Sequence, residues 1–121
     1  MSEQSIIAGK RILVVEDEFL ICDDMVSRFE GEGAEVIGPV GTVDGALQLI
    51  NETPAIDAGV LDVSLHGQMS FPVAALLVSR GIPFLFATGY DAAVIPEEFR
   101  STVRCEKPVD PGALARALFP G

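Results

Sequence analysis

The chain has 121 residues, 49% of them hydrophobic, which suits one folded domain with its own core. Its 18 acidic residues against eight Lys and Arg give a formal net charge of −10. That charge argues against nucleic acid or an anionic membrane surface as a partner, because both require clustered basic residues.

The N-terminus shows no signal-peptide pattern, and no apolar run approaches the roughly 18 residues that a membrane span needs. The two cysteines, Cys22 and Cys105, lack metal-type spacing and are interpreted as small core residues. We therefore expect a soluble, cytoplasmic protein. Residues 1–9 are expected to form a flexible leader.

Five short runs rich in Val, Ile and Phe alternate with segments of helical spacing. The runs predict strands at residues 11–15, 34–37, 56–61, 83–87 and 102–105. Helices are predicted from Phe19 to Phe29, after the Thr42 cap to Ile50, between Ser70 and Gly81, and from Asp110 to Leu118. A further helix, the fourth in chain order, starts at Asp91 and is cut short by Pro96.

This alternation predicts an α/β fold with right-handed βαβ units and a parallel sheet covered on both faces. We expect a flavodoxin-like three-layer sandwich with strand order 2-1-3-4-5 and five helices, the fourth short or irregular. One domain would span residues 10–121, with no attached output domain.

Polar residues follow four of the predicted strands, at the sheet edge where open parallel sheets bind ligands. Glu16 and Asp17 follow the first strand, and Asp62 follows the third. Thr88 follows the fourth, and Lys107 lies just beyond the fifth. Because the first and third strands are neighbours in this order, Asp17 and Asp62 are expected to face each other.

Crowded carboxylates repel one another, and either protonation or a divalent cation would relieve the repulsion. Mg²⁺ binds a few carboxylates and leaves positions for phosphate oxygens. Asp62 would then be a nucleophile that forms an acyl phosphate. Lys107 and Thr88 would stabilise the negative charge of the transferring group.

Four short motifs carry these residues, and together they resemble the receiver domain of bacterial two-component response regulators over nearly the whole chain. The motifs are Val15-Glu16-Asp17-Glu18, Leu61-Asp62-Val63, Ala87-Thr88-Gly89 and Glu106-Lys107-Pro108. The resemblance implies that Asp62 is the phosphoacceptor, Thr88 the switch hydroxyl and Lys107 the partner of the phosphate. It also implies a Mg²⁺ site made by Asp17 and Asp62 directly, by Glu16 largely through water, and by the Ser64 carbonyl. A cis peptide bond between Lys107 and Pro108 is expected as well.

One position departs from the family pattern. Many receivers carry an aromatic switch residue three positions before the lysine, where this chain has Arg104. The stretch from Phe86 to Tyr90 resembles stand-alone receivers that read Phe-Ala-Thr-Gly plus an aromatic residue. Tyr90 is therefore the candidate that replaces the missing switch residue.

The resemblance implies a single-domain response regulator that accepts a phosphoryl group on Asp62 from a histidine kinase or a histidine phosphotransfer protein. It would act as a phosphorylation-controlled protein-binding switch or a phosphorelay intermediate, with an unidentified output protein as partner. We expect a monomer or a weak phosphorylation-dependent dimer. The chain would be no enzyme beyond its own phosphotransfer and autodephosphorylation.

Three alternative functions compete with this interpretation. A haloacid-dehalogenase-like phosphatase needs a second acid two residues after its nucleophile, where this chain has Ser64. A flavodoxin-type carrier needs a hydroxyl- and Gly-rich phosphate loop after the first strand, where Glu16, Asp17 and Glu18 would repel the FMN phosphate. A degenerate receiver is disfavoured by the intact site residues. His66, the only histidine, is interpreted as a solvated loop residue.

Overall fold

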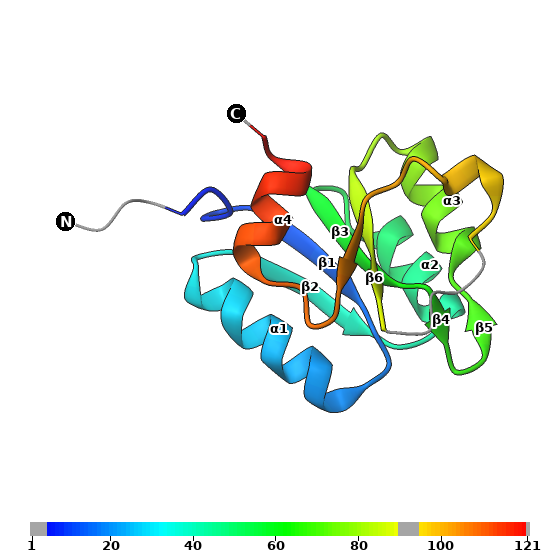
Figure 1. Ribbon diagram of the computed structural model, residues 1–121, viewed down its shortest axis with the longest axis horizontal. Helices are drawn as coiled ribbons and strands as arrows, with labels where there is room; N and C mark the ends of the chain where they lie inside the picture. The colour runs from blue at the N-terminus through cyan, green and yellow to red at the C-terminus, as the bar shows by residue number, and fades with distance from the viewer. Residues whose placement is uncertain (1–4, 90–94, 121) are drawn as a thin grey trace.

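The computed structural model describes residues 5–89 and 95–120, and a five-stranded parallel sheet lies at its centre (Figure 1). The strands lie in the spatial order β2-β1-β3-β6-β7. Their bounds are β1 Arg11–Val15, β2 Glu35–Val40, β3 Ala58–Asp62, β6 Phe84–Thr88 and β7 Arg104–Glu106. All neighbouring strands pair in parallel, so the predicted 2-1-3-4-5 order is confirmed.

Four α-helices cover the two faces of the sheet in the part of the chain that the structure describes. On one face, α1 (Phe19–Gly31) and α4 (Pro111–Leu118) pack over a core that includes Met25, Phe29 and Leu114. On the other face, α2 (Val43–Glu52) and α3 (Phe71–Ser79) cover the second core cluster. None of these helices has the length and apolar character needed to cross a membrane.

The helix starts follow their capping residues. The Thr42 hydroxyl accepts a hydrogen bond from the Gly45 amide at 3.0 Å, and Asp110 accepts from two amides of the first turn of α4. Ser70 also precedes its helix as predicted, but its hydroxyl is buried and makes no capping hydrogen bond. The sequence signals thus place three helix starts correctly, while only two of the three side chains cap them.

The strands alternate their side chains between the two cores. On β1, Leu13 and Val15 belong to the core under α2 and α3, whereas Ile12 and Val14 face α1 and α4. All five residues of β3 are buried, as expected for a central parallel strand. The carboxyl ends of β1 and β3 are therefore held side by side by packing on both faces.

Between β6 and β7, the described residues contain only a short 3₁₀ helix, η1 (Glu97–Phe99). It begins directly after Pro96, which occupies its N-cap position. The helix predicted to start at Asp91 falls on residues 90–94, outside the described part. Phe99 of η1 stacks on Phe71 with ring centroids 5.8 Å apart and contacts Phe86 edge-on, which ties η1 to α3 and β6.

A small hairpin after β3 was not predicted. Its strands, β4 (Ser64–Leu65) and β5 (Gln68–Met69), pair antiparallel across a two-residue turn. The turn residues His66 and Gly67 have φ values of +48° and +81°, as the tightest hairpin turns require. The usual Asn-Gly or Asp-Gly signature is absent here, which explains why the sequence alone did not indicate a hairpin.

The segment expected as a leader contributes to the core. Ile7 is fully buried among the residues under α1 and α4, and the Gly9 amide donates to the Gly33 carbonyl at 2.8 Å. The packed domain therefore includes Ile7 and does not start at residue 10. The sequence does not reveal this because the run Ile6-Ile7-Ala8 is too short to indicate a strand or a helix.

Replacing Ile7 with alanine is expected to destabilise the fold by about 2–4 kcal/mol, the usual cost of truncating a buried aliphatic side chain. Its neighbour Ile6 is 55% exposed, so Ile6→Ala is the matched control, with a change within about 0.5 kcal/mol. Urea unfolding followed by circular dichroism measures both. Equal small effects would show that the segment does not belong to the core.

Candidate functional site

The carboxyl ends of the strands surround an open cleft of about 730 Å³. Side chains from four strand ends and from the hairpin line it, although they are far apart in the sequence. The polar residues lining it are Asp17, Glu18, Asp62, Ser64, His66, Thr88 and Lys107. Glu16 lies buried beneath them. The structure therefore brings all the predicted site residues to one edge of the sheet.

Four carboxylates crowd at this edge. Glu16, Asp17, Glu18 and Asp62 each have an oxygen within 4.8 Å of the others. The expectation that Asp17 and Asp62 face each other is therefore confirmed. Glu18 was not among the predicted site residues, because its place one residue further along the loop gave no sign that its side chain turns back toward Asp62.

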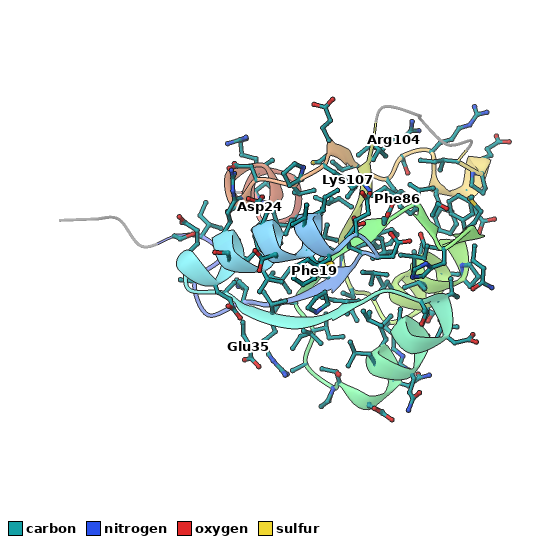
Figure 2. The ribbon with its side chains drawn as sticks, turned by 90° about the horizontal axis from the view of Figure 1, so that it is seen from below. Phe19, Asp24, Glu35, Phe86, Arg104 and Lys107 are labelled. Carbon is teal, nitrogen blue, oxygen red and sulfur yellow. The ribbon has the colours of Figure 1, made fainter. Side chains whose placement is uncertain are left out.

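Lys107 balances part of this negative charge and is labelled in Figure 2. Its Nζ lies 3.1 Å from Glu18 Oε1, 3.2 Å from Asp62 Oδ2 and 3.4 Å from Glu16 Oε1. Burial opposes the charge on the ammonium, but attraction to Asp62 and Glu16 outweighs burial and raises the pKa of Lys107 above its usual value. Lys107 is therefore a fixed positive charge at all physiological pH values.

Glu16 is the most buried of the acids, with 2% of its surface exposed. Its Oε2 accepts hydrogen bonds from the amides of Asp17 at 3.2 Å and Glu18 at 3.1 Å. Its Oε1 is buried without a hydrogen bond from any described residue, and the Lys107 ammonium lies 3.4 Å from it. Burial, and next the negative charge of Asp62, raise the pKa of Glu16 from its ordinary 4.5 to about 7.

The two aspartates are oriented by backbone amides. Asp62 Oδ1 accepts from the Ser64 amide at 3.3 Å, and Asp17 Oδ2 accepts from the His66 amide at 2.8 Å. The His66 ring is largely exposed, in agreement with its interpretation as a solvated residue, and its Nδ1 lies 3.7 Å from the same Asp17 oxygen. The sequence did not reveal this backbone role, because any residue at the tip of the hairpin supplies the same amide.

Thr88 and Lys107 are held together by the backbone. The Lys107 amide donates to the Thr88 carbonyl at 3.0 Å, and the peptide bond between Lys107 and Pro108 is cis, as predicted. The Thr88 hydroxyl lies 3.5 Å from the Cys105 carbonyl and so points toward β7. Arg104, also labelled in Figure 2, is exposed on β7 and pairs in register with Phe86. Tyr90, the other switch candidate, lies outside the described residues.

The donor atoms at this edge suit a hard divalent cation. All four side chains offer carboxylate oxygens, which Mg²⁺ prefers, and the Glu16 oxygen without a hydrogen bond is the kind of buried group that a cation or its water would satisfy. Ser64 lines the cleft, and the role of its carbonyl as a metal ligand stays a prediction.

Without a cation, the raised pKa of Glu16 makes stability depend on pH. The folded protein binds the Glu16 proton more tightly than the unfolded chain, so this stabilisation is complete below pH 4.5 and is lost as pH rises to about 7. In a chelator, Glu16→Gln should therefore gain stability over the wild type by on the order of 1–3 kcal/mol across this window.

Urea unfolding at pH values from 4.5 to 8 measures the difference, and Glu30→Gln, at an exposed position of α1, is the matched control. A constant offset between Glu16→Gln and the wild type at every pH would contradict the assignment of the raised pKa to Glu16.

No protein-family model matches the chain. The solution structure of SdrG from Sphingomonas melonis Fr1 is 40% identical, with a TM-score of 0.79, and the match covers 91% of this chain and 93% of that one. The response regulator PhyR from Brucella abortus is 26% identical, with a TM-score of 0.74, over 95% of this chain and 51% of PhyR.

A curated relative, the transcriptional regulatory protein PdtaR from Mycobacterium tuberculosis, is 28% identical over 112 residues. That match covers 92% of this chain, which spans about half the length of PdtaR. The similarity to SdrG extends over nearly the full length of both chains, and the structural neighbours of this chain are receiver domains. The chain therefore belongs to the response regulator receiver domains.

Proposed function

We propose that the chain is a response regulator switched by phosphorylation of Asp62. The observation that carries this proposal is the Asp62 carboxylate at the wall of an open cleft, with the Lys107 ammonium 3.2 Å from Oδ2. A carboxylate oxygen would attack the phosphorus of a phosphohistidine, the bond from phosphorus to the imidazole nitrogen would break, and the imidazole would leave. The donor would be a histidine kinase or a histidine phosphotransfer protein.

Each neighbouring residue has a distinct task in this scheme. Lys107 would pair with the phosphoryl oxygens and stabilise their charge. Glu16, Asp17, Asp62 and the Ser64 carbonyl would hold Mg²⁺, which when bound supplies positive charge beside the phosphoryl oxygens. The catalysis would be limited to the chain's own phosphorylation and dephosphorylation.

The Thr88 hydroxyl is the proposed reporter of the phosphorylated state. Its contact with the Cys105 carbonyl, at 3.5 Å, lies at the outer limit of a hydrogen bond, so releasing it costs little. Turning toward a phosphoryl group on Asp62 would release this contact between β6 and β7 and change the surface around Thr88. An output protein would recognise that rearranged surface.

Acetyl phosphate with Mg²⁺ tests the site directly. Intact-mass measurement should show one added phosphoryl group on the wild type and on Asp23→Asn, a control at an exposed aspartate of α1, but none on Asp62→Asn. Omitting Mg²⁺ and adding a chelator should suppress the labelling. Labelling of Asp62→Asn, or of no variant at all, would reject Asp62 as the acceptor.

Two apolar side chains at the start of α1 mark the proposed contact for the phosphodonor protein. Phe19 is 79% exposed and Leu20 is 80% exposed, more than any other large hydrophobic residue in the described part of the chain. They directly follow Glu18, and the next residue, Ile21, lines the cleft. Apolar surface of this kind beside a reactive group suits a partner that must place its histidine near Asp62.

The double variant Phe19→Ala/Leu20→Ala should separate docking from chemistry. Phosphotransfer from a phosphorylated histidine kinase that serves the wild type should slow by roughly tenfold or more, because a few well-packed anchor residues carry most of the binding energy of an interface. Labelling by acetyl phosphate should not change. The control is Val78→Ala, since Val78 is 60% exposed at the far end of α3. Equal slowing with both donors would show damage to the site instead of lost docking.

A further inference from the structure

Three carboxylates surround the Lys107 ammonium, and the proposed phosphorylation of Asp62 assigns no role to one of them, Glu18. The ammonium has three N–H groups, and its neighbours are Asp62, Glu16 and Glu18. Glu18 gives the shortest of the three distances, 3.1 Å. The ammonium donates hydrogen bonds to Glu18 and Asp62, whereas Glu16 Oε1 receives none, so a phosphoryl oxygen that binds Lys107 competes with carboxylates already beside it.

The three carboxylates differ in how freely they can leave. Glu16 is buried, and two backbone amides fix its Oε2. Asp62 is 8% exposed and held by the Ser64 amide. The Glu18 side chain is 61% exposed, and its only hydrogen bond to a described residue is the one to Lys107. Glu18 is the partner that can move into solvent without leaving a buried charge behind.

We propose that Glu18 is a positioning residue that occupies Lys107 in the resting state and gives it up when the phosphoryl group arrives. The inference rests on the proposed phosphorylation of Asp62. The Glu18 carboxylate is an anion already seated on Lys107 beside Asp62, so it competes with the phosphoryl oxygens for the same N–H donor. Glu18 therefore opposes phosphorylation and keeps Lys107 oriented until a donor is engaged.

Two effects act in the same direction in this proposal. The ion pair must be broken, and the negative charge of Glu18 repels the incoming phosphoryl group across the cleft. Because exposed ion pairs are weak, removing the pair should change the rate by about two- to fivefold and not by orders of magnitude. Removing the charge of Glu18 should also make the rate of phosphorylation less dependent on ionic strength.

Three variants separate contact from charge. Glu18→Gln removes the charge, Glu18→Asp keeps the charge but withdraws the carboxylate from Lys107 by one methylene, and Glu30→Gln removes a charge at an exposed position of the same helix. The rate of labelling is measured over a range of acetyl phosphate concentrations. The second readout is the affinity for beryllium fluoride in the presence of Mg²⁺, a phosphoryl mimic that requires no chemical step.

The expected result is a two- to fivefold faster labelling and tighter beryllium fluoride binding for Glu18→Gln, a smaller gain for Glu18→Asp, and no change for Glu30→Gln. If Glu18→Asp matches the wild type while Glu18→Gln is faster, the charge acts at a distance and the contact has no role. If Glu18→Gln matches or falls below the wild type, the proposal is wrong. If the wild type is labelled on Asp62 and on no other residue, the proposed phosphorylation stands even where the Glu18 variants contradict the proposal for Glu18.

Discussion

The concentration of four carboxylates around one ammonium is the constraint on which the rest of this structure depends. Parallel strands packed on both faces bring Asp17, Asp62 and Lys107 to the same edge, and the hydrophobic cores hold them there. Lys107 offsets only part of the charge, since burial and Asp62 still hold the pKa of Glu16 near neutrality. The metal-free protein therefore retains repulsion between these carboxylates that a bound cation would relieve.

The architecture was predictable because its signals are local and repeated. Continuous apolar runs indicated buried strands, and Thr42 and Asp110 indicated helix starts through side chains that cap them in the structure. The strand order came from the family resemblance, and the pairing of β1 with both β2 and β3 confirms it. The site followed from this order, because each predicted residue comes directly after a strand or close to one.

Other features could not be deduced because they depend on side-chain direction or on long-range contacts. The sequence gives no reason to treat the acidic residue Glu18 differently from Glu30, yet the Glu18 carboxylate accepts a hydrogen bond from Lys107, 89 residues away. Ile7 was expected to belong to a flexible leader, whereas in the fold it packs in the core cluster under α1 and α4. The turn of β4 and β5 rests on a His-Gly pair, which is a weak hairpin signal.

That hairpin has a consequence for how the acidic edge is built. The His66 amide reaches back across 49 residues to Asp17, so the loop after β1 and the loop after β3 are joined before any ion is present. A carboxylate oriented during folding loses little further freedom when it captures a cation, which is the general advantage of preorganisation. The affinity of this acidic edge for a divalent cation would thereby depend on the integrity of a small surface hairpin that contributes only a backbone amide to the aspartate it orients.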